Sequence, residues 1–111
     1  MTDNINEKLA TLREWLNPAI EGERAVLVTT AHRGVFFGYS VDTEGETIYL
    51  RAARNCLFWP AENQGFLGLA SLGPLPGSRI GPPANIRLRN ITCVAECSSM
   101  AVKAWESAPW G

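Results

Sequence analysis

The sequence has a single histidine, almost no net charge and no long apolar run, and each of these absences excludes a class of protein. A net charge of −1 provides no field that would attract nucleic acid or an anionic membrane, which argues against general nucleic-acid binding. No apolar stretch approaches the ~20 residues that a membrane-spanning helix needs. The first residues also lack the apolar segment of a signal peptide, so we expect a cytoplasmic protein whose three cysteines are free thiols.

Sequence motifs of enzymes and metal sites are scarce as well. His32 is the one histidine that could activate a nucleophile, and the neighbouring charge of Arg33 would lower its basicity. The chain contains no GxSxG, HExxH or GxxxxGK motif. Cys93 and Cys97 lack the paired short spacings of a zinc site, even if Cys56 is added. We therefore predict a protein without enzymatic activity, without metal and without cofactor; a small nucleotide hydrolase using His32 is the catalytic alternative.

What the sequence does contain is the pattern of one globular α+β domain. With 111 residues, of which 46% are hydrophobic and 19% charged, the chain is too short to divide into two stable cores. Residues 1–18 are predicted to form an amphipathic helix that ends before Pro18. From Ala25 the apolar period changes to two, which predicts three antiparallel strands joined by short turns: AVLVTTA, GVFFGYSV and ETIYLRAA.

The second half of the chain predicts one more long strand and a final helix. GFLGLASLG suits a short helical turn or a packed crossover, and a Pro/Gly loop follows over residues 73–85. NIRLRNITCVAEC alternates as a strand, with a bulge expected near Asn90 because strict alternation would place Ile91 among the arginines. A serine-capped helix is expected over 98–108. The prediction is thus an antiparallel sheet of four to five strands, with a β core over 25–97 and a helix at each end.

The segment RAARNCLFWP, residues 51–60, allows two interpretations of its arginines. In the first, Leu50, Leu57 and Phe58 belong to the core, while the arginines lie at the edge of the sheet with their charges in water. The same residue types can also form a ligand site. A guanidinium group makes paired contacts with phosphate, and an aromatic ring stacks on a base.

The second interpretation is therefore a binding pocket. Arg51, Arg54 and Asn55 would form its polar part, and Tyr49 or Trp59 its aromatic wall, with Arg79 of the Pro/Gly loop closing over it. A protein-binding surface is the third possibility. Trp15, Trp105 and Trp110 in the terminal helices suggest a homo-oligomer interface, and packing of these helices on their own sheet is the alternative.

Three stretches in this order resemble a known family: RGVFFGYSV…GETIYLRAARNCLFWP, GFLGLASLGP and IRLRNITCVAECSSMAVKAWESAPW. Their patterns, GVxxGxL, xxARxxxYW, GxxxLA and IxLxxxxxV, are those of small proteins encoded by tailed phages and prophages and catalogued as a domain of unknown function. The resemblance covers about residues 26–110. Where the family usually reads WYW, this chain has Leu57, Phe58 and Trp59. The resemblance implies a phage origin and a location in the host cytoplasm, and it supplies no function.

Two functional hypotheses remain from the sequence. The first is a phage-encoded, homo-oligomeric binding protein that counters bacterial immunity, in its most concrete form by sequestering a cyclic nucleotide or another anionic small molecule. The second is a structural or assembly protein of the phage particle, or an adaptor that binds a host protein.

Overall fold

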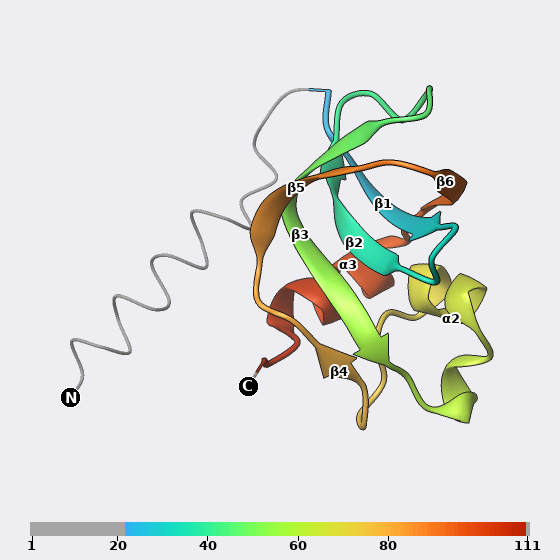
Figure 1. Ribbon diagram of the computed structural model, residues 1–111. Helices are drawn as coiled ribbons and strands as arrows, with labels where there is room; N and C mark the ends of the chain where they lie inside the picture. The colour runs from blue at the N-terminus through green and yellow to red at the C-terminus, as the bar shows by residue number, and fades with distance from the viewer. Residues whose placement is uncertain (1–21, 111) are drawn as a thin grey trace.

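The computed structural model describes residues 22–110, so the helix expected over residues 1–18, including Trp15, lies outside the described residues. The described chain forms six strands, one 3₁₀ turn and two short α-helices (Figure 1). In chain order these are β1 (Arg24–Thr30), β2 (Val35–Ser40), β3 (Ile48–Phe58), η1 (Ala61–Asn63), α2 (Phe66–Ser71), β4 (Arg79–Ile80), β5 (Ala84–Leu88), β6 (Ile91–Glu96) and α3 (Ser99–Ser107). The antiparallel sheet and the short C-terminal helix are confirmed; the expected strand number of four to five is corrected to six.

The sheet is built on the predicted meander of β1, β2 and β3, all paired antiparallel. The other edge of β3 is shared by β4 and β5, while β6 pairs with β1 at the opposite end of the sheet. Since only two residues separate β5 from β6, one segment borders both edges of the meander. The sheet must therefore curve strongly, and Figure 1 shows this segment crossing over β1 and β2.

The kink that allows this crossing lies at Asn90, where a bulge was predicted. Asn90 adopts a positive φ of 58°, a conformation that asparagine tolerates better than most residues, and its carbonyl accepts a hydrogen bond from the Ala31 amide (2.9 Å). The pairing of β1 with β6 shifts by one residue just beyond it. The shift places Ile91 on the apolar side with Val94, and the prediction of a bulge near Asn90 is confirmed.

Two apolar clusters lie on the two faces of the sheet. One joins the sheet to the helices and is centred on Trp105, which stacks on Phe37 (ring centroids 5.2 Å apart) and donates a hydrogen bond to the Leu69 carbonyl (3.0 Å). Trp105 thus packs on its own sheet. The other cluster fills the concave face and consists of Val26, Val28, Ile48, Leu50, Ala53 and Leu88.

The loop over residues 73–85 is held by a buried amide and contains the two-residue strand β4. Asn63 donates from Nδ2 to the Gly73 carbonyl (2.8 Å) and accepts at Oδ1 from the Leu75 amide (3.2 Å). A side chain at Gly68 would place its Cβ only 1.5 Å from the Asn63 carbonyl oxygen, so the close packing of α2 against η1 requires glycine there. Helix α3 begins as predicted with Ser98, whose hydroxyl accepts from the Ala101 amide (3.0 Å).

Strand β3 departs most from the sequence prediction, which ended it near Ala53. Ala52 has a φ of 52°, and the register between β2 and β3 shifts by one residue around it. The alternation of buried and exposed side chains is broken there, and the strand continues to Phe58. Leu57 and Phe58 are 63% and 53% exposed, so their assignment to the core is wrong.

Candidate functional site

The first predicted site residue, Arg51, forms an ion pair within the protein. Its Nε donates to both carboxylate oxygens of Glu23 (2.8 and 3.0 Å), and Nη2 donates to Glu23 Oε1 (2.7 Å). The two side chains are only 14% and 6% exposed, and the guanidinium lies 5.0 Å from the centre of the Tyr39 ring. This hydrogen bonding raises the pKa of Arg51. The paired geometry that could hold a phosphate is occupied by a carboxylate of the same chain.

Arg54 is fully buried and connects three parts of the chain. Its Nε donates to the Gly81 carbonyl (2.9 Å) and its Nη1 to the Trp105 carbonyl (2.6 Å), and its guanidinium lies 5.6 Å from the centre of the Trp110 ring. Burial lowers the pKa of Arg54. The Trp105 carbonyl is one of the last four of α3, which have no partner inside the helix. Arg54 therefore caps α3, where a positive charge also interacts favourably with the helix dipole.

The other four predicted site residues lie along β3 and at its two ends. Asn55 also contacts Gly81: its backbone carbonyl accepts a hydrogen bond from the Gly81 amide (2.9 Å). Tyr49 is exposed on the first half of β3, whereas half-buried Trp59 and exposed Arg79 lie at its far end. Tyr49 and Trp59 lie ten positions apart in the chain, on opposite sides of the irregularity at Ala52.

The six predicted residues consequently lie in three places rather than around one hollow. Arg54 and Asn55 meet at Gly81, Tyr49 and Arg51 precede the irregularity at Ala52, and Trp59 and Arg79 lie beyond it. None of the six lines either hollow described below. Their role in ligand binding stays a prediction.

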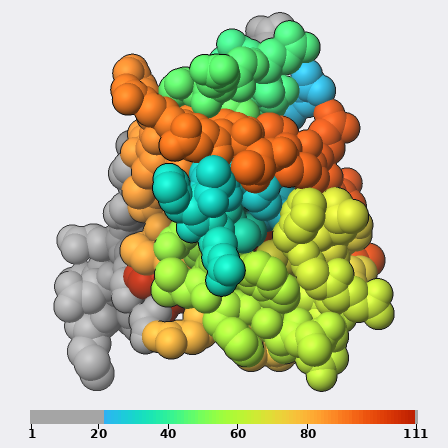
Figure 2. Space-filling model, turned by 45° about the vertical axis from the view of Figure 1, so that its right-hand side comes forward, coloured from blue at the N-terminus to red at the C-terminus, as the bar shows by residue number. Residues whose placement is uncertain are grey.

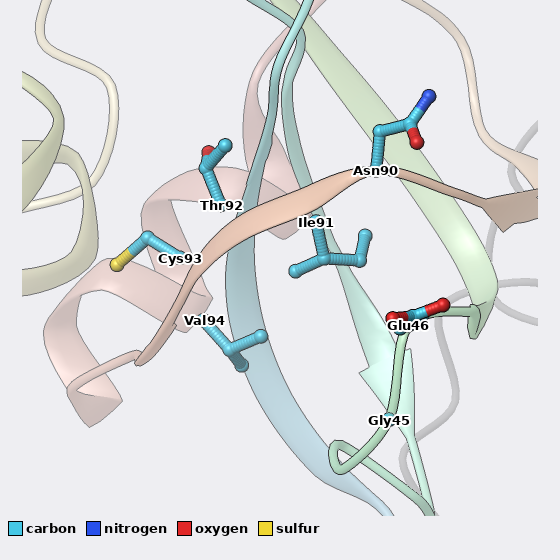
Figure 3. A pocket seen from close by; sticks show the side chains of 7 residues that line it. All are labelled: Gly45, Glu46, Asn90, Ile91, Thr92, Cys93 and Val94. Carbon is cyan, nitrogen blue, oxygen red and sulfur yellow. The ribbon is translucent and has the colours of Figure 1, made fainter.

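A hollow of about 440 Å³ runs beside β6, and sequence reasoning did not identify it. One side is formed by residues 90–94 and the other by the turn at Gly45 and Glu46 (Figure 3). Figure 3 shows the side chains of Ile91 and Val94 reaching toward that turn, while Cys93 points away from it. In the space-filling view the β6 segment runs across the front of the molecule, beneath the turn (Figure 2). We call this hollow the β6 groove.

Among residues 22–110, no backbone pairs with β6 on the side of the groove. Cys97 donates to the Ala25 carbonyl (3.1 Å), and hydrogen-bonded positions alternate in an antiparallel pair, so Cys93 and Ala95 also bond to β1. Val94 and Glu96 then direct their N–H and C=O groups away from β1, whereas Thr92 is the extra residue at the register shift between β1 and β6. Within residues 22–110 no strand pairs with this edge.

The far wall of the groove is acidic. Three exposed carboxylates, Asp42, Glu44 and Glu46, occur within five residues of the turn between β2 and β3. Asp42 accepts a hydrogen bond from the Glu44 amide (3.0 Å), which shapes the turn. The ion pairs among the described residues are Arg24–Glu96 and Arg51–Glu23, so no described cation neutralises Glu46.

A second hollow, of about 380 Å³, lies between the Pro/Gly loop and the end of α3. Its lining, which includes Leu75, Ile80 and Ala108, is mostly apolar and carries no charged side chain. It offers neither a hydrogen-bonding edge nor a charge to orient a ligand.

Of the residues with possible catalytic chemistry, Cys93 lines the β6 groove, His32 lies apart from both hollows, and Cys56 and Cys97 are affected by burial. His32 is exposed in the turn between β1 and β2. Burial raises the pKa of Cys56 to about 11 and that of Cys97 to about 12, so both thiols are protonated at neutral pH and are weak nucleophiles. The three cysteines form no disulfide. Among residues 22–110, no group of three metal-binding side chains is clustered, and no helix is long and apolar enough to span a membrane.

The fold and the groove define a small α+β domain with an open strand edge. The chain belongs to the family DUF6948, a domain of unknown function, whose model matches residues 23–105. No curated protein and no solved structure matches the chain significantly. Membership in a family without an assigned function is thus established, and the phage origin stays a prediction.

Proposed function

We propose that this protein is a non-enzymatic binding protein of phage or prophage origin that acts by engaging another protein. The observation that carries the proposal is the β6 groove, in which an unpaired strand edge lies between an apolar floor and an acidic wall. A surface of this kind offers main-chain hydrogen bonds, apolar contact and charge together, as protein-recognition sites do.

The contacts of the two central arginines favour this form over the sequestration of a cyclic nucleotide. An anion would have to displace Glu23 from Arg51 or open the core around Arg54. Removing one partner of a partly exposed ion pair such as Arg51–Glu23 costs about 1–3 kcal/mol, so a ligand would lose that much of its binding energy. The β6 groove, in contrast, can be occupied without breaking any of these contacts.

The chemistry of the groove also supports binding without catalysis. Its lining contains one carboxylate, Glu46, and one thiol, Cys93, whose side chain points away from the turn (Figure 3). Nucleophilic catalysis needs a nucleophile and a base within about 3 Å of each other. Within the proposal the target is a host protein, and interference with bacterial immunity is the role that the phage resemblance suggests.

The proposal is tested by capturing partners from phage-infected or defence-bearing cells with three forms of the protein: wild type, Val94→Pro and Val94→Thr. Proline removes the Val94 amide hydrogen, which faces the groove and not β1, whereas threonine retains it. Both substitutions replace the half-buried Val94 side chain, and threonine keeps its branched shape. We expect a partner that binds wild type and Val94→Thr and is lost from Val94→Pro.

Two further measurements separate the competing functions. Calorimetry with a panel of cyclic di- and trinucleotides should give no heat, and binding of any of them would replace the proposal with the sequestration hypothesis. Mass spectrometry of purified virions should not detect the protein; its presence in the particle would indicate the structural or assembly role.

A further inference from the structure

We infer that the β6 groove receives an extended peptide with alternating basic and apolar side chains, which adds a strand to the free edge of β6. The inference rests on the proposed function, because it specifies which kind of protein segment the groove binds. Three properties of the groove lead to it: its backbone, its floor and its wall.

The backbone of β6 is prepared for pairing. Val94 and Glu96 present N–H and C=O groups outward in the regular spacing that an incoming antiparallel strand matches. Edge strands are normally protected from such pairing by proline, lysine or a bulge within the edge. The bulge of β6 lies at Thr92, near the start of the strand, and the regular part that follows it, from Cys93 to Ala95, contains no proline and no charge.

The floor of the groove is apolar and continuous with the core. Ile91 and Val94 are half-buried and pack against the cluster that contains Val26 and Val28. A strand added to β6 would lie about 4.8 Å from it, and every second side chain would point to the same face as Ile91 and Val94. Apolar side chains at these alternate positions would complete the burial of the two residues.

The wall selects the occupant by charge and by space. Glu46 lines the groove, and Asp42 and Glu44 belong to the same turn, so lysine or arginine in the peptide would complement it. The turn also stands on the side of the groove opposite β6 (Figure 3). If β6 of a second copy paired with this edge, the strand next to that β6 in the second copy would overlap the turn at Gly45 and Glu46. The turn therefore disfavours a second copy as the occupant. The hollow, about 440 Å³ in volume, is within the size range of ligand sites.

The test uses the full chain and two fluorescent heptapeptides, one alternating lysine with valine and one alternating glutamate with valine, in anisotropy titrations. We expect the lysine peptide to bind wild type at least tenfold more tightly than the glutamate peptide, with an advantage that falls as salt is raised. Val94→Pro should weaken binding at least tenfold, and Val94→Thr should bind as wild type does. Glu46 is exposed, so Glu46→Lys tests the charge without affecting the core, and we expect it to reverse the peptide preference.

Hydrogen exchange of the free protein tests the other possible occupants. The amides of Val94 and Glu96 should exchange rapidly without peptide and become protected when the lysine peptide is added. Protection in the free protein would overturn the inference. Sedimentation would then identify what covers the edge of β6. A dimer would indicate a second copy of the chain, and a monomer would indicate the chain's own N-terminal residues.

The failures of the inference and of the proposed function can be told apart. Equal binding of both peptides, or unchanged peptide binding by Val94→Pro, would refute the inference, while a captured protein partner would leave the proposed function intact. If neither a peptide nor a cellular protein binds any form of the chain, both are wrong.

Discussion

The two halves of β3, on either side of Ala52, contain similar residues and use them in opposite ways. In the first half, Leu50 is buried and Arg51 lies near the surface in an ion pair. In the second half, Arg54 is completely buried and Leu57 is exposed. Both halves belong to one continuous strand, so the difference arises from the neighbours that each half meets and not from the strand itself.

The two arginines show what those neighbours are. Arg51 faces Glu23, a residue next to β1, and gains a carboxylate partner. Arg54 faces the end of α3 and the residue after β4, where it donates to two backbone carbonyls and lies over the Trp110 ring. Arginine thus serves as an ion-pair partner in one half of the strand and as a helix cap in the other.

The largest effect is expected from shortening the leucines. Leu50→Ala should lower the free energy of unfolding by about 2–5 kcal/mol because it leaves a cavity in the concave core. Leu57→Ala, the matched substitution in the second half, should change it by less than about 0.5 kcal/mol because its side chain is exposed. Urea unfolding of both variants measures the comparison, and similar losses would mean that Leu57 is buried by an additional contact.

The second prediction concerns the buried arginine. Arg54→Met keeps most of the side-chain volume and leaves the carbonyls of Gly81 and Trp105 without their donor. We expect a loss of about 2–4 kcal/mol, since each charged hydrogen bond contributes about 1.5–3 kcal/mol and the burial of a charge is relieved. Thermal unfolding followed by circular dichroism measures it. A variant as stable as wild type would show that the cap on α3 contributes nothing.

A smaller effect is expected for the ion pair of the first half. Arg51→Gln should cost about 1–3 kcal/mol because the Glu23 side chain, 6% exposed, would lose its charged partner. Adding Glu23→Gln should recover part of this loss. A double-mutant cycle in urea measures the coupling, and strictly additive losses would contradict a direct interaction.

The smallest effect tests the irregularity that separates the two halves. Ala53→Gly should lower stability by about 1–2 kcal/mol, through chain entropy and the loss of a buried methyl group. Ala52→Gly loses a buried methyl as well, yet glycine relieves the strain of a φ of 52°, so we expect a change within about 0.5 kcal/mol of zero. Equal losses at the two positions would argue against strain at Ala52.

Local patterns predicted much of the fold. The alternation from Ala25 identified the meander, and the mismatch between Asn90 and Ile91 identified the bulge. The serine cap likewise identified the start of α3. These features are written in neighbouring residues, because periodicity and capping depend on spacings of a few positions.

The candidate site was not accessible to the same reasoning. The groove joins a turn at Glu46 to a strand at Thr92, and no local pattern relates two segments so far apart in the chain. The available signals were indirect: a last strand followed directly by a helix, and three acids within the turn DTEGE. Neither signal indicates that the two segments face each other.

By itself, then, the sequence determined the elements of this protein: the period of each strand, the turns, the bulge and the capped helix, all set by short-range sterics and hydrogen bonding. Only the tertiary structure decided which charged and apolar side chains beyond Ala52 are buried and which are exposed. It buried Arg54 beneath the end of α3, exposed Leu57 and Phe58, and left one edge of β6 open beside an acidic turn. The physical reason is that burial and pairing depend on which distant segments meet, and curvature of the sheet is what brings those segments together.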